Sequence, residues 1–399
     1  MGKIFRDETG QKILETMNRQ NALLQLLVGE KVATMDIKTF KSLSRSGLAS
    51  KVFDVGDQIF VKWTDKVTEK EYDVPLDIVS FGTAVLENGE TVQGTYLQWH
   101  YATPVSVQFD NYEAFYVAET ELPAGTYNVK IGANWGNNCK ENTVYSFTLT
   151  KPVPVGGQLS GFYRIPDVSA SELKVYSWES NTATTPIETV STRVAEEGTN
   201  LGTLVAAGND KLNSLHRVGY GYGRYGQSAI RQWLNSDKET NAWWEPQNKY
   251  DRPPQELAQR AGFLTGFQED FLSAIEKIKI KTALNTVIPT DKETGYDITY
   301  EKIWLIAAEQ MYIKPDGADE GTAFEYWKKI SGRTSPYEWW QTYPNMASYA
   351  VENHKSAQYV RTRSASRGNA YNAWYVNASG YVDYTSASWT YRSEPVCFI

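Results

Sequence analysis

Residues 358–393 read QYVRTRSASRGNAYNAWYVNASGYVDYTSASWTYRS. The stretch holds six Tyr, two Trp and four Arg, has no Lys, and contains Asp383 as its one acidic residue. Aliphatic residues, which build a core when regularly spaced, are few beyond Val360, Val376 and Val382. Tyr, Ser, Gly, Asn and Arg are instead typical of adaptable protein-binding surfaces. The stretch therefore predicts a binding surface carried on several short strands and turns.

Two other interpretations of this stretch are a set of edge strands with polar faces and a low-complexity tail. The spaced apolar residues and the closing run PVCFI at 395–399 favour order over a tail. Upstream, residues 228–234 and 268–280 have the pattern of short helices, and residues 302–306 have that of a buried strand. Together these signals predict an α+β fold for the last part of the chain.

Residues 50–152 have the period of two that is typical of strands. Runs such as QIFVKW at 58–63 and TYNVKI at 126–131 alternate polar with apolar or β-branched residues, and turn pairs separate them. These runs predict a small antiparallel β-sandwich. The run KPVPVGG at 151–157 combines prolines with a Gly pair, which marks a domain edge. We expect three parts, namely a helical attachment or oligomerisation segment at 1–49, a β-sandwich domain at 50–152, and a ligand-binding domain at 153–399.

The amino-terminal segment contains one stretch with a helical pattern, QKILETMNRQNALLQLLV at 11–28. Its Leu14, Met17, Asn21, Leu24 and Val28 are spaced by three and four residues, like the seam of a short coiled coil with one polar member. An amphipathic helix that packs on its own domain fits the pattern equally well.

Composition argues against several classes of function. The 399 residues carry a net charge of −7, so duplex nucleic acid and anionic membranes repel the chain on average. Two cysteines exclude a disulfide framework and a Cys-based zinc ribbon, and three histidines without HxxxH spacing argue against a His-rich metal site. The first residues lack the apolar run of a secretory signal or a membrane span. We expect no metal, no cofactor, no nucleic-acid partner and no membrane insertion.

Catalytic motifs are weak. The glycine-rich GYGYGRYG at 219–226 lacks a following GKS or GKT, so a flexible loop with aromatic tips fits better than a phosphate loop. The run WWEPQN at 243–248 resembles the Glu-Pro-Asn motif of true C-type lectins only loosely, and its tryptophans are better explained by packing. Trp339 and Trp340 beside Glu338 suggest a sugar platform, but such platforms bind without cleaving. The sequence therefore favours a binder over an enzyme.

Several segments together resemble one known family. The residues RTRS at 361–364, AWYVN at 373–377, Gly380 and RSEPV at 392–396 are similar to the carboxyl-terminal domain of phage and bacterial proteins diversified by diversity-generating retroelements. The helix SAIRQWLN at 228–235 and the strand around Trp304 match as well, so the resemblance covers about residues 158–399. The resemblance implies a C-type lectin-like fold for residues 153–399. The LPAGTY turn and the PVPVGGQL join are also similar to gut-phage structural proteins.

In that family, randomised asparagine codons vary the contact positions, and such codons cannot produce Trp, Lys, Glu or Gln. The absence of Lys agrees with this rule, whereas Trp389 departs from it, and Glu394 stands where the pattern more often has a basic or apolar residue. Trp374 matches a fixed framework tryptophan that packs under the binding face. Carried over position by position, the ligand-contacting residues that the resemblance implies are Tyr359, Arg361, Arg367, Asn369, Tyr371, Asn372, Tyr375, Tyr381, Tyr384, Ser386, Trp389 and Tyr391.

The resemblance implies a phage virion protein, made in the host cytoplasm, that binds a protein or glycan receptor on the host cell from the particle surface. The amino-terminal parts would attach it to other virion proteins as a homotrimer, because multivalency adds avidity to weak contacts. Tail-tip, tail-fibre and capsid positions all fit. The alternatives are a bacterial surface or secreted ligand-binding protein of the same fold and, less favoured, a carbohydrate-active enzyme.

Overall fold

The computed structural model describes residues 36–110, 115–118, 121–130, 144–155, 157–160, 172–176, 188–194, 215–217, 223–245, 253–283, 296–314, 319–339, 341–366 and 372–399. These residues form a mixed α+β structure with mostly antiparallel strands in several small sheets and a few short helices. The predicted α+β class is confirmed at this level. The predicted coiled-coil pattern at 11–28 lies outside the described residues.

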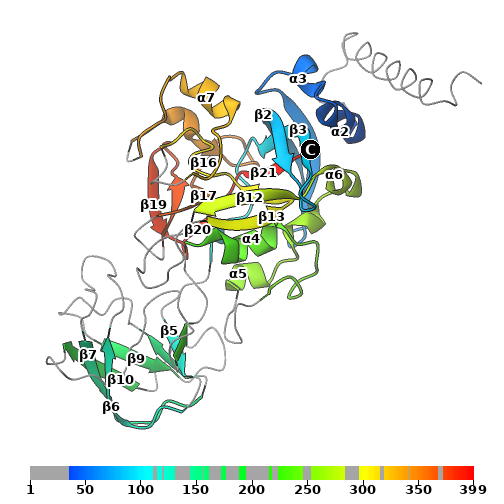
Figure 1. Ribbon diagram of the computed structural model, residues 1–399. Coiled ribbons are helices and arrows are strands. Elements are labelled where there is room, and N and C mark those ends of the chain that lie inside the picture. Colours follow the sequence, from blue (N-terminus) through cyan, green and yellow to red (C-terminus); the bar gives the residue numbers. More distant parts are fainter. Residues whose placement is uncertain are drawn as a thin grey trace, which may run out of the picture.

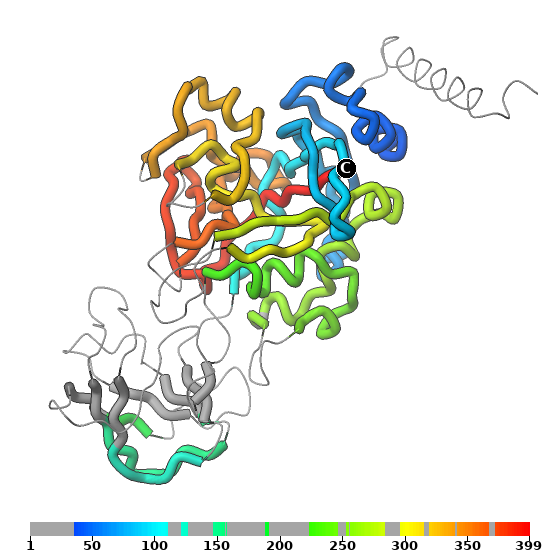
Figure 2. The backbone as a smooth tube through the Cα atoms, in the orientation of Figure 1, coloured from blue at the N-terminus to red at the C-terminus, as the bar shows by residue number. Residues whose placement is uncertain are grey.

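The central sheet joins the two ends of the chain. Its strands follow the order β1-β2-β3-β21-β14, and all neighbouring pairs are antiparallel. The carboxyl-terminal strand β21 thus lies between an amino-terminal strand and β14 (Figures 1 and 2). The strands are β1 (Gln58–Asp65), β2 (Lys70–Val85), β3 (Thr91–Trp99), β21 (Pro395–Phe398) and β14 (Ile303–Leu305).

This pairing does not follow the predicted domain boundaries. Strands β1 to β3 lie within the range expected to form a separate β-sandwich, but they hydrogen-bond to strands from the end of the chain. The short strand β4 (Val107–Gln108) likewise pairs with β20 (Thr390–Tyr391). The prediction was wrong here because alternation identifies strands but not their partners. Residues 58–108 and the carboxyl-terminal region form one body.

A second sheet has seven strands in the order β11-β5-β8-β9-β10-β7-β6. It takes strands from both sides of the boundary predicted at residue 152, so that boundary does not separate two sheets either. The strands are β5 (Phe115–Ala118), β6 (Gly125–Lys130), β7 (Val144–Leu149), β8 (Gln158–Ser160), β9 (Glu172–Tyr176), β10 (Glu188–Val194) and β11 (Leu215–Arg217).

The first described helix, α2 (Ile37–Arg45), packs on the central body. The Asp36 side chain accepts a hydrogen bond from the Thr39 main-chain nitrogen at 3.1 Å and caps the helix. Phe40 and Leu43 are buried in the core. Residues 37–45 therefore belong to the folded body and not to a free attachment segment.

The other predicted elements have mixed outcomes. Helix α4 (Ala229–Leu234), capped by Ser228, and strand β14 confirm the predictions for 228–234 and 302–306. The helix predicted at 268–280 ends early, because α6 (Glu269–Ala274) is followed by strand β12 (Ile278–Ala283). The remaining helices are α3 (Ala49–Val52), α5 (Gln255–Ala258), α7 (Glu325–Ser331) and the 3-10 turns η2 (Tyr225–Gln227), η3 (Phe263–Gly266) and η4 (Pro344–Met346).

The described residues of the carboxyl-terminal stretch form short strands and turns, as predicted. Their main sheet has the order β17-β18-β19 and is antiparallel. These strands lie beside the central body (Figure 1). The bounds are β17 (Val360–Ala365), β18 (Asn372–Val376) and β19 (Val382–Ser386), with two-stranded pairs formed by β15 (Ser348–Tyr349) with β16 (Ala357–Gln358) and by β12 with β13 (Tyr296–Glu301).

Candidate functional site

The rings of Tyr359, Tyr375 and Tyr391 form a cluster. Strand register places Tyr375 opposite Arg361 on one side and opposite Asp383 on the other. The main-chain nitrogen of Arg361 donates to the carbonyl of Arg392 at 2.9 Å, and this bond aligns the 359–361 and 390–392 segments. Residues far apart in the sequence are therefore held side by side by main-chain bonds.

The ring centroids of the three tyrosines lie close together. Tyr359 is 5.9 Å from Tyr375 and 5.2 Å from Tyr391, both in stacked orientation, and Tyr375 is 4.9 Å from Tyr391. Tyr359 is 44% exposed and the nearby Trp389 is 59% exposed. We call Tyr359, Tyr375, Tyr391 and Trp389 the tyrosine face. It offers four large aromatic rings and three hydroxyl groups, carried by strands β18 and β20 and by the residues that precede β17 and β20.

Arg361 lies beneath the tyrosine face and is 1% exposed. Its guanidinium donates to the carbonyls of Ala373 at 2.8 Å, Ser386 at 2.9 Å and Trp389 at 3.3 Å. No carboxylate of the described residues forms an ion pair with it. Burial lowers the pKa of Arg361 to about 10, so the group still carries its charge at neutral pH.

The position of Arg361 corrects the contact role expected for it. Its two Nη groups donate to carbonyl oxygens inside the fold and its Nε group is buried, so Arg361 connects these segments and is not exposed to a ligand. Asn372 is also buried, at 6% exposure, and its contact role is corrected in the same way. Arg363, the other arginine of strand β17, is also buried, at 1% exposure.

The other predicted contact residues lie in three environments. Tyr359 and Trp389 are exposed, and Tyr375 is buried, at 9% exposure. The half-buried members are Tyr381, Tyr384, Ser386 and Tyr391. Arg367, Asn369 and Tyr371 lie outside the described residues. Trp374 is buried and contacts Trp339 and Tyr384 edge to face, as its predicted framework role requires.

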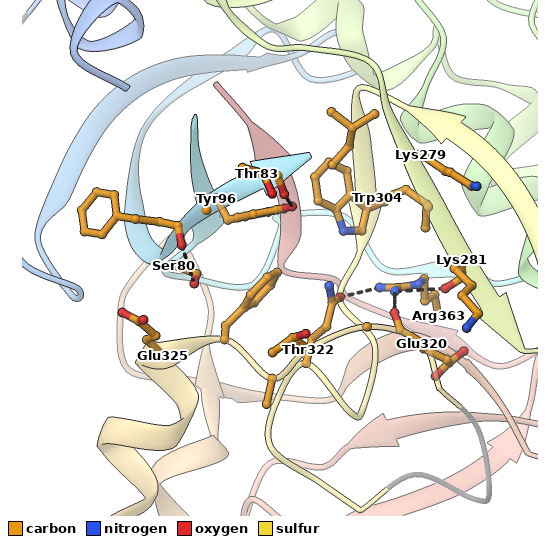
Figure 3. Close-up of a pocket in the computed structure, with 18 of the residues that line it drawn as sticks. Ser80, Thr83, Tyr96, Lys279, Lys281, Trp304, Glu320, Thr322, Glu325 and Arg363 are labelled. Carbon is orange, nitrogen blue, oxygen red and sulfur yellow. Dashed lines mark hydrogen bonds between the residues drawn. The ribbon is translucent and has the colours of Figure 1, made fainter. Parts of the chain in front are cut away.

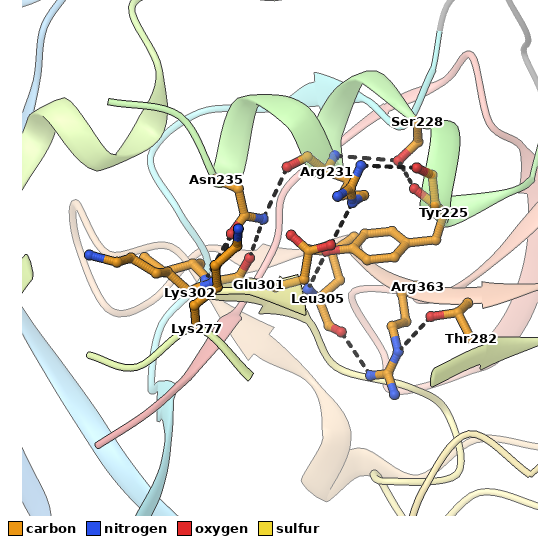
Figure 4. Close-up of polar contacts among 12 residues, drawn as sticks. Tyr225, Ser228, Arg231, Asn235, Lys277, Thr282, Glu301, Lys302, Leu305 and Arg363 are labelled. Carbon is orange, nitrogen blue, oxygen red and sulfur yellow. Dashed lines mark hydrogen bonds and ion pairs between the residues drawn. The ribbon is translucent and has the colours of Figure 1, made fainter. Parts of the chain in front are cut away.

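A buried polar network fixes strand β17 to the central sheet (Figure 4). The Arg363 guanidinium donates to the Leu305 carbonyl at 3.0 Å and to Gln310 Oε1 at 2.6 Å. The Tyr225 hydroxyl accepts from the Leu305 main-chain nitrogen at 3.3 Å. The sequence interpretation placed Tyr225 in a flexible loop, whereas it is fully buried. This network attaches strand β17, which carries Arg361, to strand β14 of the central sheet.

The structure also contains a cavity of about 450 Å³ (Figure 3). Its walls come from β2, β12 and the segment 320–328, and its lining shares no residue with the tyrosine face. Sequence reasoning missed this site because its residues come from distant segments, and their only early signal was the buried-strand pattern around Trp304.

The other motifs have structural roles where they are described. Trp243 is 3% exposed and meets Trp244 edge to face, so the packing interpretation of these tryptophans is confirmed. Among the described residues, no group of three or more His, Cys, Asp and Glu side chains could hold a metal ion. The helices within the described ranges are all too short or too polar to cross a membrane.

Comparison with known families gives one match. Residues 201–399 match a domain of unknown function, DUF6273. No curated protein and no solved structure matches the chain. The DUF6273 region contains β14 and β21, but the other three strands of their sheet, β1 to β3, precede residue 201. In this chain the DUF6273 region therefore depends on residues outside the match to complete its central sheet.

Proposed function

We propose that this protein is a phage virion protein that binds a receptor on the host cell through the tyrosine face. The observation that carries the proposal is the exposure of Tyr359 and Trp389, which directly precede strands β17 and β20 in segments that hydrogen bonds of Arg361 and Arg392 hold in place. Exposed aromatic side chains on a rigid support are typical of residues that dominate binding energy.

The tyrosine face suits contact with a protein or a glycan. Tyr and Trp contribute large contact areas and lose little conformational entropy on binding, because each has only two side-chain torsions. The Tyr375 hydroxyl donates to Asp383 at 3.4 Å, which orients the hydroxyl edge of the cluster. The positive charge of Arg361 lies 4.6 Å from the Tyr391 ring centroid. Because this charge already lies against one face of the Tyr391 ring, a cationic ligand would gain little cation–π energy from that ring.

The fold and assembly belong to the same proposal. The mixed α+β arrangement, with short strands carrying the aromatic stretch, supports the C-type lectin-like fold that the resemblance implies. Attachment to other virion proteins and trimerisation would come from the amino-terminal part of the chain. Three copies of the face on one particle would convert a weak contact into firm adhesion.

The test is binding of the purified full chain to bacterial cells and to arrays of bacterial surface glycans. We expect Tyr359→Ala and Trp389→Ala each to weaken binding about tenfold or more, because residues of this type contribute about 2 kcal/mol when they anchor an interface. The melting temperature of Trp389→Ala should stay within about 1 °C of the parent, because its side chain is mostly exposed, whereas Tyr359→Ala, which loses two ring contacts, should lower it by no more than about 4 °C.

Matched controls are Phe60→Ala and Tyr296→Ala, which remove aromatic side chains exposed by 48% and 37% on β1 and β13. These variants should bind like the parent protein. Equal loss in all four variants, or undiminished binding by Tyr359→Ala and Trp389→Ala, would contradict the proposal. Release of sugar from the bound glycans would instead favour the enzyme alternative, and absence of the protein from purified particles would favour the bacterial alternative.

A further inference from the structure

The cavity is lined by more cationic than anionic side chains. Its lining contains four cations and two carboxylates, namely Lys279, Lys281, Lys328 and Arg363 against Glu320 and Glu325. The whole chain carries a net charge of −7, so this local excess has the opposite sign to the molecule as a whole. A hollow lined by one sign of charge concentrates ligands of the other sign. The lining therefore favours an anion.

The buried charges of the cavity are engaged within the fold. Arg363 is 1% exposed and donates to the carbonyls of Leu305 at 3.0 Å and Glu320 at 2.7 Å. The Glu320 carboxylate, in a residue that is 3% exposed, accepts from the Ala283 main-chain nitrogen at 3.1 Å and from Ser364. These two charges are of opposite sign and serve the fold, so a ligand would contact neither of them.

The exposed charges of the cavity leave one positive charge in excess. The Lys281 ammonium pairs with Asp319 at 2.7 Å. Lys279 on β12 and Lys328 on α7 are exposed, and neither forms an ion pair with another described residue. Glu325 is the exposed carboxylate of the lining. Two lysines against one carboxylate match a ligand with a single negative charge better than one with two.

Aromatic side chains supply an apolar wall in the same cavity. The ring centroid of Tyr96 is 5.1 Å from that of Phe324, and the Tyr96 hydroxyl donates to the Thr83 carbonyl at 2.8 Å, which fixes the ring (Figure 3). Tyr96 and Phe81 are half-buried and line the cavity. Gln310 lines it as well, and its Nε2 group donates to no described residue. The volume of about 450 Å³ lies in the range of small-molecule sites.

We propose that this cavity binds a small organic monoanion that has a carboxylate group and an apolar body. The carboxylate lies toward Lys279 and Lys328, and the apolar body lies against Tyr96 and Phe81. A free organic acid and the acidic unit of a glycan both present this chemistry. Because exposed charges are screened by salt, binding weakens as the ionic strength rises.

The test measures binding of the purified full chain by saturation-transfer NMR and calorimetry. The probes are phenylacetate and methyl glucuronide, each compared with a neutral molecule of similar shape, phenylacetamide or methyl glucoside. We expect at least one carboxylate to saturate with a Kd of the order of 1 mM, and its neutral counterpart to bind at least tenfold more weakly. Tighter binding of phenylacetate indicates a free organic acid, and tighter binding of methyl glucuronide indicates a glycan unit.

Charge variants connect that binding to the lysines of the cavity. Lys279→Gln and Lys328→Gln should each weaken carboxylate binding about threefold, and the double variant about tenfold. Glu325→Gln removes the exposed carboxylate and should strengthen binding about twofold. Lys66→Gln removes the same charge from an exposed lysine outside the lining, and it should bind like the parent.

A size variant locates the ligand in the cavity. Thr322→Trp places a large ring at an exposed position of the lining and should weaken binding at least tenfold, whereas Thr334→Trp, at an exposed threonine outside the lining, should bind like the parent. Three results would each overturn the proposal: absence of saturation by both carboxylates at about 50 mM, equal binding of the neutral counterparts, or unchanged binding by the double lysine variant or by Thr322→Trp.

Discussion

The guanidinium of Arg361 lies 4.6 Å from the ring centroid of Tyr391 while its nitrogens donate to main-chain carbonyls of three segments. One residue thus connects the segments that carry the tyrosine face and places a cation against two of its rings, those of Tyr375 and Tyr391. Both Nη groups donate to main-chain carbonyls, and the Nε group is buried without a hydrogen-bond partner, so this side chain presents no donor at the surface. Arg361 is consequently a positioning residue, and its loss should first be seen as a loss of stability.

Replacing Arg361 tests that role directly. In Arg361→Gln the carbonyls of Ala373 and Ser386 lose their donors inside the fold, so we expect the free energy of unfolding to fall by about 3 kcal/mol. The melting temperature should fall by roughly 5–10 °C. Arg361→Lys keeps a charge but not the planar fork, and it should recover only part of the loss. Thermal unfolding followed by near-UV circular dichroism measures all three proteins.

Arg333→Gln is the matched control for this series. Arg333 is exposed, and its guanidinium also lies over a tyrosine, 5.2 Å from the Tyr337 ring centroid. We expect its loss to change the unfolding free energy by no more than about 0.5 kcal/mol. If Arg361→Gln changed the unfolding free energy as little as Arg333→Gln, the guanidinium of Arg361 would not stabilise the contact between these strands.

Burial of Glu394 makes stability depend on pH. Desolvation raises the pKa of this carboxyl group from 4.5 to about 8, so the folded chain keeps it protonated where the unfolded chain ionises it. Between these pH values the unfolded state binds fewer protons, and stability therefore falls as the pH rises. The contribution is fully present below pH 4.5 and lost above about pH 8. We expect the free energy of unfolding to fall by about 2–4 kcal/mol from pH 5 to pH 8.

His100 acts in the same direction. Its hydrogen bond to Asp77 raises the pKa of the imidazole above 6.5, so its contribution is also lost as the pH rises through the folded value. Glu394→Gln should remove most of the pH dependence of the unfolding free energy and leave only the smaller contribution of His100. Glu239→Gln, at an exposed position, should leave the pH dependence as it is in the parent protein. Urea unfolding at pH 5, 6.5 and 8 gives the unfolding free energy of the parent and of both variants at each pH. An unfolding free energy of the parent that does not change with pH would refute the role of Glu394.

Local patterns predicted several elements correctly. The strand pattern at 58–63 and the helix at 228–234 were found because alternation and a three-to-four residue period are properties of the segment itself. The helix predicted at 268–280 was too long, because apolar residues at 271, 275 and 278 fit a helical face, although the last of them starts strand β12. Periodicity alone does not separate these two states for short apolar runs.

Non-local relationships could not be predicted in this way. The composition of 358–393 indicated a surface, but it did not reveal that Arg361 is buried, since the carbonyls that receive its donors lie on other strands. The cavity was missed for the same reason. The pairing of β21 with both β3 and β14 depends on contacts between residues about 90 to 300 positions apart, for which a single sequence holds no signal.

A glycine pair tests the insertion of β21 into the central sheet. Gly94 and Gly82 face each other across β3 and β2. A Cβ at Gly94 would overlap the Phe398 ring and the Ile399 carbonyl oxygen, whereas a Cβ at Gly82 would meet only the Tyr96 ring, at 3.8 Å. We expect Gly94→Ala to lower the free energy of unfolding by about 1–3 kcal/mol and Gly82→Ala to change it by less than about 0.5 kcal/mol. Amide hydrogen exchange of residues 395–399 should accelerate in Gly94→Ala alone, and equal protection in both variants would contradict this packing.

The central sheet also predicts the smallest piece of chain that folds. The DUF6273 match covers residues 201–399, yet β21 needs β3 as its hydrogen-bonded neighbour, and the core combines Trp63 and Trp99 with Trp304. A fragment of residues 201–399 would expose β21 as an unpaired edge and leave that core open, and both defects favour aggregation. We expect this fragment to lack cooperative unfolding, while residues 36–399 unfold in a cooperative transition within about 3 °C of the full chain. Adding residues 36–110 as a separate chain should restore part of the cooperative signal. A cooperative transition in the 201–399 fragment alone would show that the sheet forms without its three amino-terminal strands.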